Sequence, residues 1–277
     1  MTKKLIWIYL LFIGFNLFSE EAIAISPSKL EDWAGRKVGK KILEKNLLLK
    51  DGVLASSADQ LLYVLTAASL PIEATGTYLF EGKLSLPEAT KKSKVYFGVA
   101  CYDASDRMIQ GANAKPVEGS ESVLLADAPA GSRQLLVEDS SKWLRRSGSV
   151  VAFNCLENYS DLPNFDLSPS VTHIEKEDKG WTVTLRSPLR KTFAAGNKIR
   201  QQVGASYIYI TADRKQELGW TIYSKTFQGI GVVNAGKADM TLPPGTVKAK
   251  IVVFSTGEPT EIQIKDVLLK QITQGKP

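Results

Sequence analysis

The sequence predicts an all-β protein, and three observations carry that prediction. From residue 46 onward, short apolar or alternating runs recur, and turn residues separate them about every 8–12 positions, as in a β-sandwich or barrel. No helical periodicity longer than a few turns occurs in that part of the chain. Alternation is clear in residues 95–102, where Val95 and Phe97 share one side and Tyr96 and Tyr102 share the other.

The start of the chain predicts a secretory signal peptide over residues 1–24. Lys3 and Lys4 form a basic start, residues 5–18 are an apolar run, and Ala22-Ile23-Ala24 offers small residues for cleavage. Because the apolar run is short for a membrane span, we expect it to be removed. The mature chain should then have no transmembrane segment and should be secreted or periplasmic.

The composition is ordinary for a globular protein, with 44% hydrophobic residues, 23% charged residues and a formal net charge of +6. The surplus positive charge lies mainly in residues 25–45 and 200–277. It could favour an anionic surface, a polysaccharide or a lipid head group, or it could form a solvated surface that keeps the protein soluble. Export and the lack of an arginine-rich aromatic stripe argue against a nucleic-acid partner.

Residues 25–45 predict a lead segment of one or two broken helical turns. Residues 28–31 have the spacing of a capping box, and Gly35 and Gly39 would each weaken a continuous helix. The apolar residues that could line one helical face are Leu30, Trp33, Val38 and Ile42. We expect this segment to pack on the domain through Trp33.

The strand candidates follow in chain order, with turn residues in the segments between them. They are residues 46–50, 61–67, 77–86, 94–103, 122–125, 134–138, 149–154, 171–176, 180–186, 198–203, 206–211, 221–228, 237–241, 247–255 and 261–270. The mature chain of roughly 250 residues is long enough for one large β domain or two small ones.

Five segments carry a likeness to a known family. They are residues 78–82 (YLFEG), 95–103 (VYFGVACYD), 220–224 (WTIYS), 242–246 (LPPGT) and 264–269 (IKDVLL). Together they resemble strands and turns of the jelly-roll carbohydrate-binding modules, the galactose-binding-like β-sandwiches of secreted proteins. The resemblance implies a discontinuous jelly-roll β-sandwich made of residues 46–111 and 200–272.

Residues 112–199 separate the two parts and predict an inserted β subdomain, and residues 273–277 form a tail. Within the insertion, residues 130–139, Trp143 and residues 149–154 resemble small all-β modules of secreted and phage tail proteins. Loops on rigid scaffolds are where binding sites accumulate, so the insertion could carry a function of its own.

A glycan-binding face is expected from the resemblance together with strand parity. Tyrosine and tryptophan rings can stack on the C–H faces of pyranose sugars. Parity favours Tyr96, Tyr207 and Tyr209 for a groove, and Tyr102 and Trp220 are further candidates. Alternatively, these tyrosines lie at the edge of the core with their hydroxyl groups toward water.

The resemblance also implies a structural calcium ion, since the closing strand of the family usually carries paired aspartates. Asp266 is present here, but Lys265 stands in the place of the second aspartate. Glu81 or Asp51 could add a carboxylate, because calcium prefers six to eight oxygen ligands. The alternative is an ion-free Asp266 that forms a salt bridge with a lysine.

The residue types give little basis for catalysis. His173 is the single histidine, so neither a Ser-His-Asp triad nor a multi-histidine zinc site can be built. Carboxylates of the loop 157–166, such as Asp161 and Asp166, could flank a sugar as in a glycoside hydrolase, or they could cap a turn. We therefore expect a protein without enzymatic activity.

The two cysteines, Cys101 and Cys155, lie in apolar strand-like runs. In an oxidising compartment they could form a disulfide bond. Buried free thiols are common in such runs, so two unpaired cysteines are the alternative.

Three functional hypotheses follow from these observations. The first is a secreted, non-catalytic carbohydrate-binding protein that recognises a polysaccharide or oligosaccharide through tyrosines on one sheet face. The second is a structural or protein–protein interaction module of the cell envelope, with other envelope proteins as partners. The third is a carboxylate-dependent glycoside hydrolase.

Overall fold

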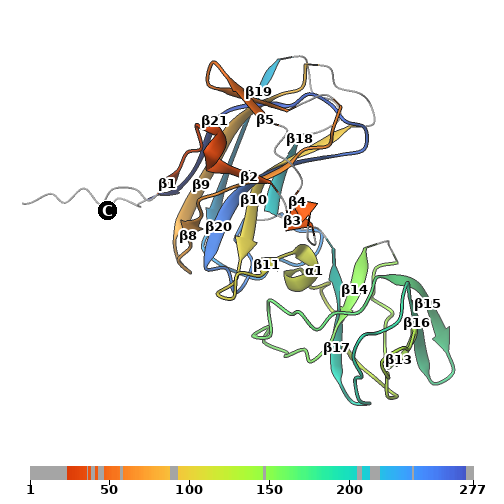
Figure 1. Cartoon of the computed structure of the whole chain (residues 1–277). Coiled ribbons are helices and arrows are strands. Elements are labelled where there is room, and N and C mark those ends of the chain that lie inside the picture. Colours follow the sequence, from red (N-terminus) through yellow and green to blue (C-terminus); the bar gives the residue numbers. More distant parts are fainter. Residues whose placement is uncertain are drawn as a thin grey trace, which may run out of the picture.

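The computed structural model of the chain consists of a β-sandwich and a smaller inserted β unit (Figure 1). It describes residues 24–35, 37–38, 41–42, 47–56, 59–87, 93–145, 148–204, 208–212, 219–238 and 240–272. Within these ranges the pairings between strands are antiparallel. The predicted all-β fold class is confirmed.

Eight strands build the sandwich from two facing sheets. The first sheet has the order β19 (Trp220–Gln228), β9 (Thr77–Ser85), β21 (Gln263–Ile272), β6 (Val53–Ser56). The second sheet has the order β18 (Ile208–Ala212), β10 (Lys94–Tyr102), β20 (Lys248–Thr256), β7 (Tyr63–Thr66). Along the chain these strands alternate between the sheets, except that β10 and β18 are neighbours in the second sheet. This is the connectivity of a jelly roll.

Shorter strands extend both sheets at their edges. The first sheet gains β5 (Leu47–Lys50) and β1 (Ala24–Ile25), and the second gains β2 (Trp33–Gly35), β8 (Leu70–Pro71) and β11 (Met108–Ile109). A separate two-stranded hairpin is formed by β3 (Lys37–Val38) and β4 (Lys41–Ile42).

The sandwich core follows directly from the alternation of side chains along the strands. Tyr78, Phe80 and Leu84 of β9 are fully buried, as is Phe97 of β10. The rings of Phe80 and Phe97 meet edge to face across the two sheets, with centroids 4.8 Å apart. The other side of each strand is thereby left for the outer surface of the sandwich.

The lead segment departs from the helical prediction but contacts the core as expected. Only one 3₁₀ turn, η1 (Leu30–Asp32), is formed in the described part of the lead. The Asp32 carboxylate accepts hydrogen bonds from the N–H groups of Ser28 (2.7 Å) and Lys29 (2.8 Å). The next residue, Trp33, is 1% exposed and begins β2. The helical face was therefore a wrong prediction, because pairing with β7 takes the chain into a strand. Packing through Trp33 is confirmed.

The inserted unit follows β11 and a short helix, α1 (Gly111–Ala114), and consists of two small sheets (Figure 1). One has the order β12 (Ser122–Val123), β17 (Lys198–Val203), β14 (Ser149–Ala152), and the other β13 (Gln134–Val137), β16 (Gly180–Leu185), β15 (Val171–Glu177). A second hydrophobic core fills this unit, in which the rings of Phe153 and Phe193 stack with centroids 3.7 Å apart. The expected boundary at residues 199/200 falls inside β17, which pairs with β12 and β14 over its length.

The inserted unit contacts the sandwich through several bonds beside α1. The N–H of Ala235 donates to the carbonyl of Pro116 (2.8 Å), and within the insertion the N–H of Asn164 donates to the Asn113 carbonyl of α1 (2.8 Å). The Arg107 guanidinium lies 3.8 Å from the centre of the Phe165 ring. These contacts hold the insertion at the end of the sandwich where β11 lies (Figure 1).

Several strand predictions differ from the structure, and the two-residue strands β8 and β11 were not predicted. Strand β6 was missed because Asp51 and Gly52, both with positive φ (52° and 74°), form a tight turn that folds it back on β5. The described residues of the candidate 237–241, which are 237, 238, 240 and 241, do not form a strand. The backbone turns at Gly236, and the Met240 N–H bonds to the Ala238 carbonyl.

The predicted signal peptide and tail fall outside the described residues, apart from Ala24. That residue pairs with Lys270 in β21. Within the described ranges, none of the helices has the length and apolar character that crossing a bilayer would require.

Candidate functional site

The outward surface of the second sheet carries aromatic side chains where a solvated sheet usually carries polar ones. Four half-buried rings from four different strands form this surface, which we call the aromatic face: Tyr63, Tyr96, Tyr209 and Phe254. Beneath and beside the rings, Ala100 and Val252 are fully buried on the same side of the sheet. The aromatic face is therefore a second apolar layer outside the sandwich core.

Strand register brings the four rings into contact. Tyr96 lies opposite Phe254, and their rings stack with centroids 4.5 Å apart and planes 14° apart. Tyr209 lies opposite Gly98, which has no side chain, and its ring meets the Tyr96 ring edge to face at 4.8 Å. Tyr63 lies opposite Phe254 with ring centroids 5.5 Å apart.

The aromatic face continues along β20 and β10 into a more polar end. Lys250 follows on the same side of β20, and its ammonium donates to the carbonyl of Ala67 (3.0 Å). Burial, together with the nearby Lys248, lowers the pKa of Lys250. Lys248 forms an ion pair with Asp106. The sheet surface thus combines stacked rings at one end with ammonium groups at the other.

Among the predicted ligand residues, the structure brings Tyr96 and Tyr209 together. Tyr102 is on the same side of β10, further toward the end where β11 pairs. Tyr207 lies outside the described residues.

Trp220 has to be corrected as a member of this set, because β19 belongs to the first sheet. Its ring is 39% exposed, and the Lys265 ammonium lies 4.2 Å from the ring centre. Trp220 and the tyrosines therefore cannot contact one ligand on a single sheet face.

Asp266 forms a salt bridge with Lys83 (2.7 Å), as in the alternative to a calcium ligand that the sequence left open. This contact lowers the pKa of the Asp266 carboxyl group. Glu81 accepts a hydrogen bond from Ser224 (3.0 Å). No group of three or more His, Cys, Asp or Glu residues that could hold a metal occurs in the described parts of the chain. With Lys83 and Lys265 beside Asp266, these residues do not fit a calcium ion, and calcium stays a prediction without a matching donor set.

The acidic loop 157–166 uses its carboxylates in structural bonds. The Asp161 carboxylate pairs with Arg200, whose side chain is 0% exposed, and also accepts from Asn164 (2.9 Å) and from the N–H of Leu156 (3.0 Å). Burial raises the pKa of Asp161, but these bonds outweigh burial and hold the pKa below its ordinary value.

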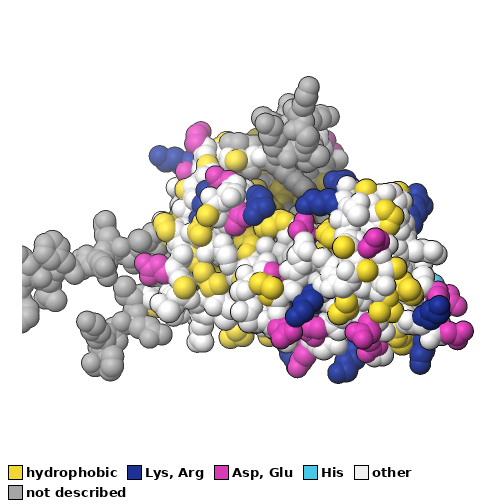
Figure 2. Space-filling model, turned by 90° about the horizontal axis from the view of Figure 1, so that it is seen from below, with side chains coloured by type: hydrophobic (Ala, Val, Ile, Leu, Met, Phe, Trp, Pro, Cys, Tyr) yellow, Lys and Arg dark blue, Asp and Glu magenta, His cyan; other side chains and the backbone are white. Residues whose placement is uncertain are grey.

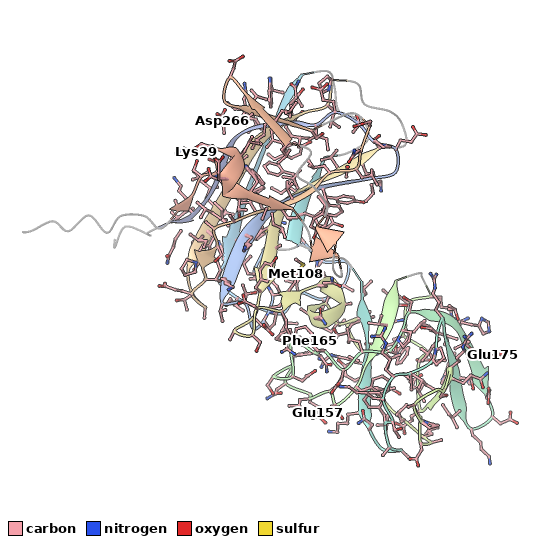
Figure 3. The ribbon with its side chains drawn as sticks, viewed as in Figure 1. Lys29, Met108, Glu157, Phe165, Glu175 and Asp266 are labelled. Carbon is pink, nitrogen blue, oxygen red and sulfur yellow. The ribbon has the colours of Figure 1, made fainter. Side chains whose placement is uncertain are left out.

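Asp166 is tied in a similar way, since it pairs with Lys191 and accepts from Asn154 (3.0 Å). This loop and Asp266 belong to different units, as the positions of Glu157 and Asp266 in Figure 3 make clear. Both aspartates therefore take part in hydrogen bonds and ion pairs that hold the loop, in line with the alternative that these carboxylates cap a turn.

Cys101 and Cys155 are both buried and neither is in a disulfide bond, so the bond considered from the sequence does not form. Cys101 is part of the sandwich core, whereas Cys155 lies in the inserted unit. Burial raises the pKa of the Cys155 thiol to about 12, which keeps it protonated.

Sequence reasoning missed two rings of the aromatic face, Tyr63 and Phe254. Alternation in β7 and β20 places each of them on the side opposite the core residues Val64 and Val253. That signal was present in the sequence, but their contact with Tyr96 follows from register, which the sequence did not reveal.

Comparison with known proteins adds no further constraint. No protein-family model matches this chain, and no curated protein sequence matches it significantly.

Proposed function

We propose that this protein is a secreted or periplasmic carbohydrate-binding protein without catalytic activity, and that its aromatic face contacts the glycan. The observation that supports this proposal is the set of four half-buried rings that contact one another outside the sandwich core. Such rings bury a large area of a pyranose C–H face at low entropic cost, because each has few rotatable bonds. Contacts between rings also hold them in place before a ligand arrives.

The polar end of the same sheet surface complements this role. Tyrosine hydroxyl groups and the Lys248 and Lys250 ammonium groups could donate hydrogen bonds to sugar oxygens while the rings stack on the sugar. Shallow, ring-based contacts of this kind imply a dissociation constant from micromolar to millimolar, about −8 to −4 kcal/mol.

The test is retention of the mature protein on a glycan array and on immobilised polysaccharides, followed by a double variant. Replacing Tyr96 and Tyr209 together by alanine should weaken retention by about tenfold or more, because each stacked ring contributes on the order of 1 kcal/mol. Trp220→Ala is the matched control, since it removes an exposed ring from the other sheet and should leave retention unchanged. Unchanged retention in a folded Tyr96/Tyr209 variant would refute the assigned face.

A second candidate function is docking in the cell envelope. The outward side of the first sheet exposes Ile222 (69%) next to Trp220 in β19, and such exposed apolar residues can contact a protein partner. Envelope association that survives loss of the aromatic face but not Ile222→Ser would favour this candidate.

A further inference from the structure

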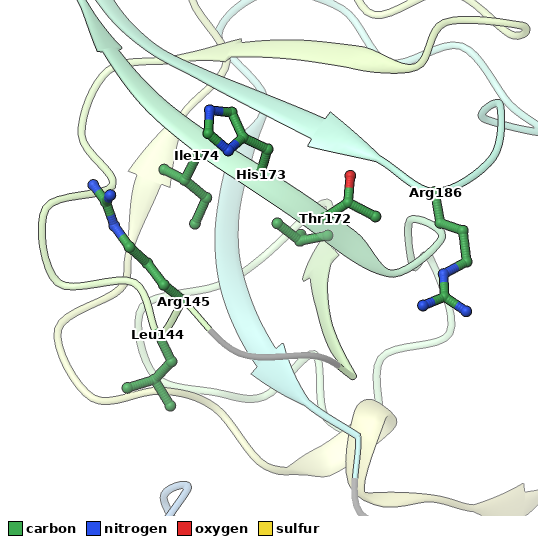
Figure 4. A pocket seen from close by; sticks show the side chains of 7 residues that line it. Leu144, Arg145, Thr172, His173, Ile174 and Arg186 are labelled. Atoms are coloured by element: carbon green, nitrogen blue, oxygen red, sulfur yellow. The ribbon is translucent and has the colours of Figure 1, made fainter.

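The inserted unit contains a hollow along β15, whose lining combines two arginines, His173 and the Thr172 hydroxyl with the apolar Leu144, Val171 and Ile174. The hollow measures about 280 Å³, and Figure 4 shows Arg145 and Arg186 at its two ends with Thr172 and His173 between them. A second hollow of about 410 Å³ shares Arg186 with the first and adds Arg190, Ser170 and Ser187. We call the two hollows together the arginine groove.

The described lining of the arginine groove carries positive charge from its three arginines. Among the described residues that line it there is no Asp or Glu. In the part of the chain that the structure describes, no ion pair is formed by any of the three arginines, Arg145, Arg186 and Arg190. Outside the lining, the Glu175 carboxylate lies 3.6 Å from the His173 ring nitrogen. By contrast, the face seen in Figure 2 mixes acidic and basic side chains over the inserted unit.

The backbone that carries the three arginines is fixed by hydrogen bonds. The buried Gln201 side chain holds both backbone groups of Leu144, accepting from its N–H (2.6 Å) and donating to its carbonyl (2.9 Å). That bond pair sets the position of the adjacent Arg145. The N–H of Arg186 donates to the Ser170 carbonyl (2.8 Å). Leu189, the residue before Arg190, is 4% exposed, and its N–H donates a hydrogen bond to the Ser132 carbonyl (2.8 Å).

We infer that the arginine groove binds the anionic groups of an acidic polysaccharide. Guanidinium groups bind carboxylate and sulfate oxygens in a bidentate manner, and hydroxyl groups beside them match a polyhydroxylated chain. Single-stranded nucleic acid is disfavoured, because no Phe, Tyr or Trp ring on which bases could stack is among the described residues that line either hollow. The groove shares no residue with the aromatic face, so this inference stands independently of the proposed glycan contact there.

The experiment measures binding of the mature protein to polygalacturonate, dextran sulfate and neutral dextran by affinity electrophoresis at about 0.15 M salt. The first polymer carries carboxylates and the second carries sulfates, so the two arms identify the anion. The groove variant replaces Arg145, Arg186 and Arg190 by glutamine. We expect binding to at least one acidic polymer to fall by about tenfold or more, since charge-assisted hydrogen bonds are lost.

A matched control removes the same net charge elsewhere, replacing the exposed Lys29, Lys179 and Lys237 by glutamine. This variant should change binding less than about twofold, because exposed charges outside a site act only through screened long-range attraction. Equal losses in both variants would reduce the effect to net charge and overturn the inference, as would absence of binding to both acidic polymers. The Tyr96/Tyr209 double variant should retain acidic-polymer binding, which separates failure here from failure of the aromatic face.

Discussion

The ring of Tyr96 stacks on the ring of Phe254 across neighbouring strands, with centroids 4.5 Å apart, on the outer side of the sandwich. The two residues lie opposite each other in the register of β10 and β20. Stacking outside the core means that these rings stabilise the sheet surface and remain near solvent. This contact is therefore where stability and the proposed function can be measured separately.

The stacked pair should show measurable energetic coupling. In a double-mutant cycle of Tyr96→Ala and Phe254→Ala, we expect a coupling free energy of about 0.5–1.5 kcal/mol, as found for aromatic pairs. Urea denaturation of the four proteins measures it. Additive effects of the two substitutions would mean that the rings do not stabilise each other.

The buried pair of Asp161 and Arg200 should be essential for the stability of the inserted unit. Asp161→Asn leaves the fully buried Arg200 guanidinium without its counter-charge, so we expect a loss of about 3 kcal/mol or more in the free energy of unfolding. Glu157→Gln is the control, because the Glu157–Lys198 pair is exposed and should contribute less than about 1 kcal/mol. A small effect of Asp161→Asn would show that water reaches Arg200.

The same pair predicts acid sensitivity. Because the pKa of Asp161 is lowered in the folded protein, the unfolded chain binds a proton at higher pH than the folded one. The stabilising contribution is therefore complete above the ordinary aspartate pKa of about 4 and is lost as the pH falls below that value. As the pH is lowered from about 6 to about 3, the melting temperature of the wild type should fall more steeply than that of Asp161→Asn.

The two cysteines should react only after unfolding. Cys101 and Cys155 are buried in different units, and the pKa of Cys155 is raised to about 12, so neither presents a thiolate to solvent. We expect a thiol reagent at pH 8 to label neither cysteine in the native protein and both after denaturation without a reductant. Failure to label the denatured protein would indicate a disulfide bond.

Gly82 of β9 should tolerate no side chain. A Cβ atom there would lie 2.6 Å from Phe97 Cε1 inside the sandwich core. We expect Gly82→Ala to destabilise the protein by about 1–3 kcal/mol, as overpacking does. Phe97→Leu removes the edge of the ring that causes the clash, so Gly82→Ala should cost less in that background than in the wild type.

Local patterns in the sequence were sufficient for much of the fold. Alternation in residues 94–102 predicted both the strand and the two sides on which Phe97 and Tyr96 lie. Trp33 was predicted to dock on the domain, since a large apolar residue in a polar lead has little alternative to burial. The helical face around it was wrong, because pairing of β2 with β7 is a long-range contact that overrides local spacing.

The candidate sites depended on tertiary structure to a greater degree. Parity nominated Tyr96 and Tyr209, but the contact of these rings with Phe254 required the register of three strands. Trp220 looked equivalent in the sequence and yet lies on the opposite sheet. The arginine groove joins residues from separate segments, which no local pattern connects.

The sequence by itself determined that this chain forms strands and which side of most strands is apolar, because a period of two is a property of the local backbone. Only the tertiary structure decided which strands are neighbours, in what register, and hence which rings and charges meet. Such contacts join residues far apart in the chain, so they depend on the packing of the whole sandwich and of the insertion within it.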